Sequence, residues 1–199
     1  CLVGSEMCIR DRVSVVAGDT VVLDNAELAA GALTATASLG DLSVKDAVIT
    51  ATKDGVTLTA EAADIDASSA KLTVKDELTL TAQQSITATD ANVTSNSLTM
   101  TANTGSVEAS RLTATVADQA SVEAGNSVTL DSSKLGLGAL TASAKSSDLS
   151  LTSAEIEVSG AAKLTAQDSI TATDANVTSN SLTMTAETGS GEASDFMAT

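Results

Sequence analysis

The sequence predicts an all-β solenoid, a right-handed parallel β-helix of about nine rungs that repeat with a period of 21. The first observation behind this prediction is an apolar residue that recurs at steps of 21, with one step of 23. A fixed period of this length indicates a solenoid, whose units bury their apolar faces only by stacking. The second observation is a local alternation of apolar and hydroxyl residues, which is typical of half-buried strands. The recurring apolar residues are Val21, Leu42, Ile65, Ile86, Val107, Val128, Leu149 and Ile170.

A second file of small or apolar residues follows two positions after the first. Side chains two positions apart in a strand point to the same side, so we expect both files to face inward. The single step of 23 contains Asp54-Gly55, a pair typical of an insertion in a turn. The members of the second file are Leu23, Val44, Ala67, Ala88, Ala109, Leu130, Leu151 and Ala172.

Each rung has room for three short strands. In the third full rung we expect them at Val56–Ala60, Ile65–Ala67 and Ala70–Val74. Acidic turns at Glu61–Asp64 and Lys75–Glu77 separate these strands from one another and from the next rung. Each strand is then expected to pair with its equivalent one rung away, ~4.8 Å along the axis.

A helical solenoid is the structural alternative, because alanine is abundant and is the best helix former. Two helices and two turns do not fit within a single period of this sequence. The alternation of threonine and valine also opposes the helical period. Asp24–Ala32 is the only segment whose sequence is compatible with a helical turn.

A longer repeat is superimposed on the rungs. Leu98, Leu140 and Leu182 recur at steps of 42, twice the basic period, and are expected to form a second inward stack. The segments Thr81–Ala102 and Thr165–Ala186 are identical except for Gln84 in the first and Asp168 in the second. Because the offset between these segments equals four periods, we infer that four rungs were duplicated as a block.

Residues 1–12 fall outside the repeat and carry both cysteines. Within them, Met7–Arg12 resembles one reading frame of the transposon mosaic-end adapter used in preparing sequencing libraries. We therefore expect residues 1–12 to be a disordered, adapter-derived segment that packs against nothing. The domain is then residues 13–199, a repeat segment that we expect to be truncated at both ends. It has no cysteine for a disulfide, a metal ligand or a nucleophile.

The composition argues against several classes of function. The chain has no His, Trp or Tyr, and its formal net charge is −16. Proton transfer commonly uses histidine, so we expect no enzymatic activity. That expectation covers the polysaccharide-active β-helix enzymes, which an acidic-glycan turnover assay would detect. The negative charge and the 10 scattered Lys and Arg residues argue against nucleic-acid binding. No apolar run approaches the ~18 residues of a membrane span.

The segment Leu80–Thr94, LTAQQSITATDANVT, resembles the haemagglutinin repeat of filamentous-haemagglutinin-type bacterial exoproteins. A near-copy begins at Leu164, and an L-T-x-T-A signature follows at Leu98–Ala102. The resemblance covers residues 13–199 and implies a right-handed parallel β-helical stalk. Such stalks are secreted by two-partner systems and act in adhesion or present a contact-dependent toxin. The glycines common in the family's turns are largely replaced here by Gln, Ser and Asp.

Small polar residues recur four positions after the core apolar residues. One interpretation is a calcium ladder, because Ca²⁺ binds six to eight oxygens. The interpretation we favour is turn geometry, for which Asp, Asn and Ser are the usual residues. The positions are Asn25, Asp46, Ser69, Asp90, Ser132, Ser153 and Asp174.

Pairs of outward threonines form a longer array that resembles the flat face of ice-binding proteins. Threonine is also an ordinary outward residue of strands, where it makes good cross-strand pairs. Ser121 with Glu123, and Lys163 with Thr165, interrupt the array. The glycosylation sequons at Asn92 and Asn176 are common by chance in a threonine-rich chain. The pairs are Thr34/Thr36, Thr57/Thr59, Thr79/Thr81, Thr99/Thr101, Thr141/Ser143 and Thr183/Thr185.

These observations favour a non-catalytic structural stalk segment of a large secreted or cell-surface bacterial adhesin. An ice-binding protein is the alternative, and a polysaccharide-active enzyme is the third. We assign no catalytic, cofactor-binding or metal-binding residues and expect no cofactor. The expected partners are an outer-membrane secretion partner and, through regions outside this segment, a receptor on a host or neighbouring cell. The expected location is secreted or on the bacterial outer surface, without a transmembrane segment.

Overall fold

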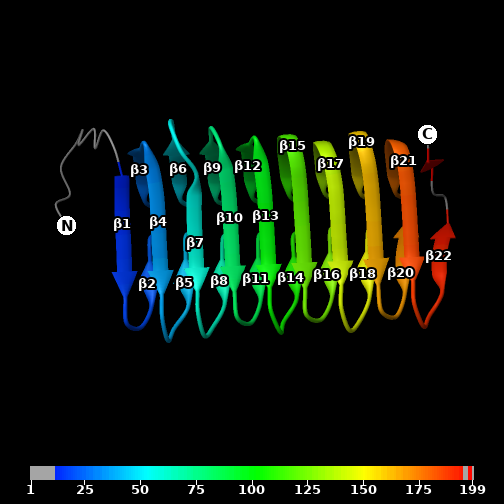
Figure 1. Cartoon of the computed structure of the whole chain (residues 1–199), viewed down its shortest axis with the longest axis horizontal. Helices are drawn as coiled ribbons and strands as arrows, with labels where there is room; N and C mark the ends of the chain where they lie inside the picture. Colours follow the sequence, from blue (N-terminus) through cyan, green and yellow to red (C-terminus); the bar gives the residue numbers. More distant parts are fainter. Residues whose placement is uncertain (1–11, 195–196, 199) are drawn as a thin grey trace.

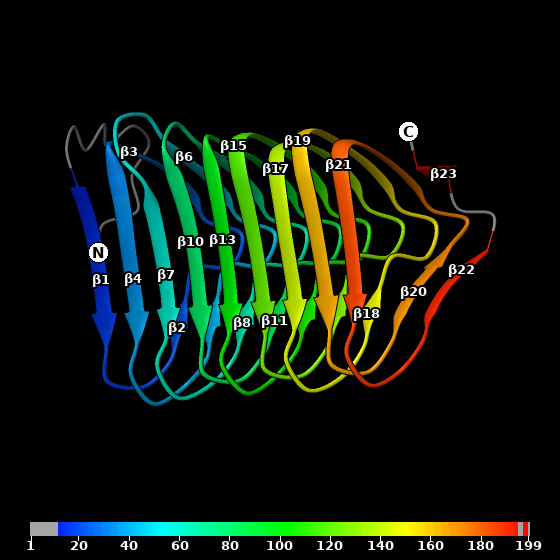
Figure 2. The ribbon, with the colours of Figure 1, turned by 45° about the vertical axis from the view of Figure 1, so that its right-hand side comes forward.

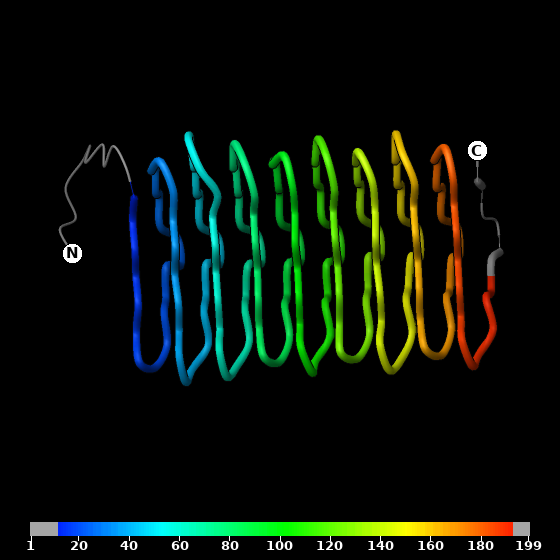
Figure 3. Tube along the Cα trace, viewed as in Figure 1, coloured from blue at the N-terminus to red at the C-terminus, as the bar shows by residue number. Residues whose placement is uncertain are grey.

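A computed structural model describes residues 12–194 and 197–198 of the chain. Its strands wind into a single right-handed coil, running down the front, up the back and forward along the axis (Figure 1). The trace in Figure 3 shows the rungs stacked side by side like the turns of a spring. The predicted parallel β-helix is therefore confirmed. Residues 1–11 of the segment predicted to be adapter-derived lie outside the described residues. Arg12, the last residue of that predicted segment, was expected to pack against nothing but begins strand β1 (Arg12–Ala17) and pairs with Ala32.

Each rung has three faces, which Figure 2 separates by turning the molecule. The face with the longest strands, here called the threonine face, is at the front of Figure 1. It consists of β1 (Arg12–Ala17), β4 (Ala32–Ala37), β7 (Val56–Ala60), β10 (Glu77–Ala82), β13 (Ser97–Ala102) and the second halves of β15 (Thr113–Ala124), β17 (Lys134–Ala144), β19 (Glu155–Ala166) and β21 (Asn176–Ala186).

The second face, here called the narrow face, is a parallel sheet of nine short strands. It comprises β2 (Val21–Val22), β5 (Leu42–Ser43), β8 (Ile65–Asp66), β11 (Ile86–Thr87), β14 (Val107–Glu108), β16 (Val128–Thr129), β18 (Leu149–Ser150), β20 (Ile170–Thr173) and β22 (Gly191–Ser194). The third face holds β3 (Glu27–Ala30), β6 (Val48–Ala51), β9 (Lys71–Val74), β12 (Asn92–Ser95), the first halves of β15, β17, β19 and β21, and β23 (Met197–Ala198).

The expected strands of the third full rung match the structure closely. The strand Val56–Ala60 is confirmed as β7. Strand β8 ends one residue before the predicted bound, at Asp66, and strand β9 begins one residue after its predicted bound, at Lys71. The region from Asp24 to Ala32, where a helical turn was acceptable, contains strand β3 instead. The described residues contain no helix that could span a membrane.

The predicted inward stack of the narrow face is confirmed. Its eight residues pair in register from Val21 to Ile170, and each is at most 3% exposed. The second file is buried too, apart from Leu23, which is only partly buried near the first rung. Burial of large aliphatic side chains stabilises by roughly 1.5–3 kcal/mol each. These two files are therefore a principal source of stability.

The stack of Leu98, Leu140 and Leu182 is also present, but with alanines between its members. Leu98 pairs with Ala120 and Ala120 with Leu140, while Ala162 lies between Leu140 and Leu182. Large and small side chains thus alternate along the axis, as close packing of a narrow core requires. The residues two positions later compensate in part, because Leu140 precedes Ala142 and Ala162 precedes Leu164.

A change in corner length explains why the positions of this stack are not spaced by a regular step of 21. The step from Leu98 to its partner Ala120 is 22, whereas the step from Ala120 to its partner Leu140 is 20. On the narrow face of the same rungs, Val107 pairs with Val128 and Val128 with Leu149, each at a step of 21. Register shifts mark the corners that lead into the threonine face in β15, β17 and β19. A longer corner before this face is therefore followed by a shorter one after it.

A glycine lies in one of the shorter corners because the neighbouring backbone leaves no space. A Cβ on Gly138 would lie 2.1 Å from the carbonyl oxygen of Asp118 in the rung below. This distance is far below van der Waals contact, so any side chain there requires the corner to shift.

A file of nine alanines closes the threonine face at its lower edge. The alanines pair in register from the first rung to the last, and the inner seven are almost completely buried. Uniformly small side chains let the chain turn sharply into the narrow face. The file is Ala17, Ala37, Ala60, Ala82, Ala102, Ala124, Ala144, Ala166 and Ala186.

Candidate functional surfaces

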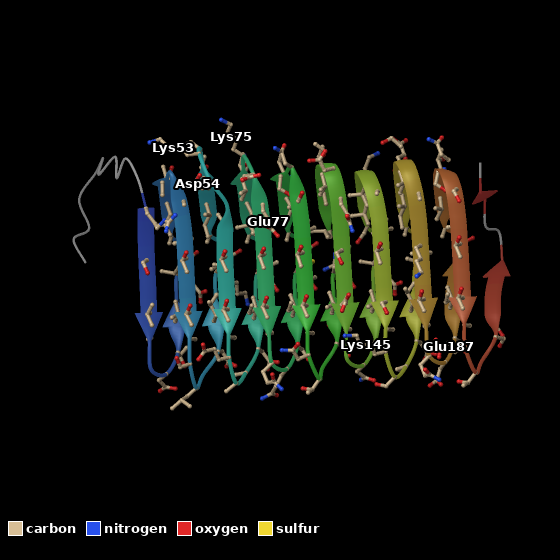
Figure 4. All side chains as sticks on the ribbon, viewed as in Figure 1. Lys53, Asp54, Lys75, Glu77, Lys145 and Glu187 are labelled. Atoms are coloured by element: carbon tan, nitrogen blue, oxygen red, sulfur yellow. The ribbon has the colours of Figure 1, made fainter. Side chains whose placement is uncertain are left out.

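The outward threonine pairs form two regular files on the threonine face. Both files are in register over four consecutive rungs, β4, β7, β10 and β13. Because the strands are parallel and in register, the threonines form a grid, here called the threonine grid, on the face that lies at the front of Figure 4. The side chains are half-buried or exposed and therefore reach solvent. A further file of outward threonines, Thr50, Thr73, Thr94 and Thr115, pairs in register on the third face.

The predicted interruptions of the grid are also confirmed. Thr99 pairs with Ser121 and Thr101 with Glu123, while Thr141 pairs with Lys163. Glu123 also makes an ion pair with Lys145, whose Nζ lies 3.1 Å from its carboxylate. The continuous array of threonines is therefore confined to the N-terminal half of the coil.

A polar groove of about 240 Å³ indents the threonine face beside the insertion Asp54-Gly55. Its floor contains one threonine from each of three rungs, and Glu77 accepts a hydrogen bond of 3.1 Å from the hydroxyl of Thr79. Figure 4 shows Asp54 and Glu77 at this upper corner, below the projecting Lys53 and Lys75. The groove is lined by Arg12, Ala32, Thr34, Asp54, Gly55, Thr57, Asp76, Glu77 and Thr79.

The recurring small polar residues occupy the corner between the narrow and third faces. All seven have positive φ, between 52° and 60°. Asn and Asp tolerate this left-handed conformation better than other non-glycine residues, since their short side chains bond to the local backbone. All seven positions thus have the turn geometry that the favoured interpretation expects; Asn or Asp occupies four of them, and serine occupies the other three, Ser69, Ser132 and Ser153.

Arg111 is the eighth member of this set, and the sequence pattern does not reveal it. It has a φ of 54° at the position equivalent to Asp90 in the rung below. Its Nε and Nη2 each donate a hydrogen bond of 2.6 Å to the two carboxylate oxygens of Asp90. The bidentate pair lowers the pKa of Asp90, chiefly through this hydrogen bond, and raises the pKa of Arg111.

Several aspartates accept hydrogen bonds from the backbone of the next rung. Asp131 accepts from Thr152 N at 2.8 Å, Asp148 from Ser169 N at 2.9 Å, and Asp64 from Ser85 N at 2.6 Å. Asp24 accepts in the same way from Lys45 N at 3.0 Å. These carboxylates satisfy backbone donors at the corners. In the described part of the chain, no three acidic residues converge on a point that could hold a metal ion.

Ionic contacts also run from rung to rung along the axis. Lys134 Nζ lies 2.9 Å from the carboxylate of Glu155 in the following rung, and this contact raises the pKa of Lys134. Both side chains are at least half exposed. Exposed pairs of this kind contribute little to stability.

Two buried serines were not anticipated from the sequence. Ser133 is satisfied, because its Oγ donates to the carbonyl of Ala109 at 2.5 Å and accepts from Leu112 N. Ser95 is buried on the third face in register with Val116, and its Oγ has no hydrogen-bond partner. The sequence contains a sign of this position, since Ser95 lies one period after Val74 in a file that is apolar except for Ser95 and its equivalent Ser179.

The sequons lie on the outer side of the third face, where Asn92 and Asn176 are exposed. Comparison with protein-family models, with curated proteins and with solved structures finds no match for this chain.

Proposed function

We propose that this chain is a non-catalytic stalk segment of a large secreted or surface-bound bacterial adhesin. The observation that carries the proposal is the uniform stacking of the rungs along a single axis. Residues at the same place in successive rungs pair in parallel on all three faces, from β1 to β21. A rod of this kind holds a distant domain away from the cell surface. The resemblance of Leu80–Thr94 to the haemagglutinin repeat supports the same assignment.

The hydrogen bonds between rungs support a mechanical role. On the narrow face, Val21 N donates to Asp41 O at 3.0 Å, Leu42 N to Asp64 O at 3.0 Å, and Ile65 N to Ser85 O at 2.9 Å. The same bond recurs in later rungs, so the rod resists bending by a repeated set of identical contacts. A stalk requires length and stiffness. The inward side chains of the rod need only fill its core, and the outward side chains need only keep the rod soluble.

Surface display tests the stalk proposal. The domain 13–199 is inserted between the secretion-signal domain of a two-partner exoprotein and a C-terminal epitope, in a bacterium that carries the outer-membrane partner. We expect an antibody to reach the epitope on intact cells. A matched insert with Leu42, Leu58 and Leu80 changed to Asp should fail, because it cannot fold into rungs. Retention of the folded insert in the periplasm would contradict the proposal.

Block duplication tests whether the segment acts as a spacer. A second copy of residues 81–164 adds four rungs in the register that the chain already uses. At ~4.8 Å per rung, the rod should lengthen by ~19 Å with an unchanged cross-section. Small-angle X-ray scattering measures both dimensions. An increase in the cross-section without added length would show that the block does not stack.

The in-register grid of β4, β7, β10 and β13 supports ice binding as a second candidate. Thermal hysteresis of the purified domain is the assay. If the grid binds ice, Thr57→Lys should abolish the activity, because a charge disturbs an ordered water layer. Thr73→Lys, on the outer side of the third face, is the matched control and should retain it. Absence of hysteresis in the unmodified domain would eliminate this candidate.

A further inference from the structure

The outward residues of the third face distribute charge unevenly along the rod. Lys71 begins β9 and Lys75 follows that strand at the corner; both are exposed, and neither forms an ion pair within the described part of the chain. The outward residues of β12 and of the first half of β15 are uncharged. Glu155 and Glu157 follow in β19 and are also exposed. Strand β15 lies midway, two strands from β9 and two from β19.

Gly136 is a glycine inside a strand of this face that the fold does not require. It occupies an outward position of β17, in register with Thr115 on one side and Glu157 on the other. Its φ is not positive, and a Cβ at this position would meet no atom within 4 Å. A glycine within a strand packs no side chain and often marks a place where another backbone or a ligand approaches closely. Gly136 therefore indicates that something lies against this part of the third face.

Two grooves lie on this face, one on each side of β15, and Thr115 lines both. The first, of about 220 Å³, includes Gly136 and the two glutamates of β19. The second, of about 500 Å³, includes Thr73 and Lys75 and is lined by no acidic side chain. On a chain with a formal net charge of −16, such a groove is a suitable place for a carboxylate. The third face thus carries an acidic groove on one side of β15 and a groove that can accept acidic side chains on the other.

The geometry points to a dimer in which two copies of this chain pack their third faces together, with their rods in opposite directions. The two-fold axis lies between the faces and runs along β15, and the facing sheets are ~10 Å apart. Strand β9 of each copy then faces β19 of the other, and β12 faces β17. Lys71 lies opposite Glu155, because both residues belong to the first outward file. Glu157 lies opposite Thr73, with Lys71 and Lys75 on either side of it.

The same arrangement explains the glycine. Thr94 and Gly136 belong to one outward file and lie one strand on either side of β15, so they face each other in the dimer. The threonine side chain of one copy occupies the space that a larger residue at 136 would fill in the other. Each groove therefore receives side chains from strands that line the other groove.

The alternative with both rods in the same direction is unfavourable. A two-fold axis along the rod would set each strand against itself in reverse, so that Lys71 would face Lys75. Like charges opposed across an interface suppress association. The antiparallel contact is isologous and is complete with two copies. The charge pattern of the face therefore selects the antiparallel dimer.

The size of the contact sets its expected strength. At ~4.8 Å per strand and ~3.3 Å per residue, the five strands from β9 to β19 cover roughly 20 Å by 13 Å. So small a contact is typical of weak, transient association. The net charge of each copy also opposes it. We therefore expect a dimer that forms only at high protein concentration. The inference does not depend on the stalk proposal.

Sedimentation equilibrium on the full chain, with reductant to keep its cysteines reduced, tests the inference up to millimolar concentration. Lys71→Glu and Glu155→Lys should each raise the dissociation constant of the dimer by ~tenfold or more, because each sets like charges opposite one another. The chain with both substitutions should dimerise again, since the two charges are exchanged. Lys163→Glu, on the threonine face, has the same net charge as Lys71→Glu and should dimerise like the unmodified chain.

Filling the space at Gly136 separates dimerisation from folding. Gly136→Val places a strand-forming residue where the single rod has room for it, so the melting temperature should be unchanged or higher. Dimerisation should be lost, because valine occupies the space of Thr94. Ala29→Val, in the same outward file but outside the five strands, is the matched control and should dimerise. Circular dichroism checks that every variant is folded.

Three results would overturn the inference. The first is an unmodified chain that stays monomeric at every concentration. The second is a dimer that neither Lys71→Glu nor Gly136→Val weakens. The third is a folded double variant that stays monomeric although the unmodified chain dimerises and each single substitution prevents it.

Discussion

The two copies of the duplicated segment have nearly the same residues but different surroundings. In the first, Thr81–Ala102, the rungs are covered on both sides, and Leu98 and Met100 are almost completely buried. In the second, Thr165–Ala186, the equivalent Leu182 and Met184 are only partly buried. A solenoid is stabilised by its own repeats and by the interfaces between neighbours. The comparison shows that the contribution of a side chain here depends on its position in the stack.

The largest difference is expected for the leucine of the second inward stack. Leu98→Ala leaves a cavity between two covered rungs and should cost ~3 kcal/mol of unfolding free energy. Leu182→Ala removes the same atoms from a partly exposed site, where we expect ~1 kcal/mol or less. Urea denaturation monitored by circular dichroism measures both. Equal losses would show that the two copies are packed alike.

Overpacking of the alanine file should give the next largest difference. Ala102→Leu forces a larger side chain between Ala82 and Ala124 and should destabilise by ~2 kcal/mol. At the equivalent Ala186, which is partly exposed, leucine has room to turn outward, so the same substitution should be close to neutral. Melting temperatures of the two variants compare them directly. A neutral Ala102→Leu would mean that this corner is loosely packed.

The unpaired hydroxyl of Ser95 predicts a stabilising substitution. Ser95→Val removes a buried oxygen that has no partner and continues an apolar file, which should raise stability by ~1 kcal/mol. Ser179, its equivalent in the second copy, is only half-buried. Ser179→Val is therefore the matched control and should have a smaller effect, measured by the same denaturation. Destabilisation by Ser95→Val would indicate that the hydroxyl is bonded in solution.

The smallest expected effect concerns Arg111, which follows the first copy in the stack. Arg111→Asn should raise the melting temperature slightly, because asparagine tolerates a φ of 54° better than arginine. Asp46→Asn, at an equivalent corner, is the control and should change little. NMR titration should also show the pKa of Asp90 rising in the Arg111 variant, since its partner is lost.

The pH dependence follows from the sign of that shift. A carboxyl group whose pKa is lowered by folding adds stability above its unfolded pKa and loses this contribution as pH falls through the folded value. The unmodified chain therefore loses the Asp90 contribution in acid, whereas the Arg111→Asn variant has little of it to lose. The advantage of the variant should be larger in acid than at neutral pH. An unchanged Asp90 pKa would contradict the role of the bidentate pair.

Much of the fold could be predicted from spacing alone. The steps of 21 identify the narrow-face core, because all its steps are 21 except the step of 23 between Leu42 and Ile65. The steps of 22 and 20 on the threonine face were not predictable, since a residue gained in one corner is lost in the next. The seven small polar residues predicted the turns in which they lie. Arg111 did not predict its turn, because arginine has no preference for positive φ.

The surfaces could be predicted only in part. The outward threonine files were predicted, because alternation in a strand fixes which residues face solvent. The groove beside Asp54 was not, since it depends on how an inserted corner lies against the rungs on either side. The ladder of aspartates that bind backbone groups of the next rung was also missed. Its members fall at two places in the rung, Asp64 and Asp148 directly before a core apolar residue and Asp24 and Asp131 three positions after one. Other residue types fill these places in most of the intervening rungs, so the sequence does not show a continuous file.

Hydrogen exchange of the two copies within one molecule tests most directly whether position in the stack determines stability. Mass spectrometry distinguishes peptides that cover the two strands when they extend one residue further, because residue 103 is Asn and residue 187 is Glu. At low salt and low concentration, the amides of β13 should exchange at least tenfold more slowly than those in the second half of β21, because end rungs open locally. Equal protection of the two copies would contradict the account.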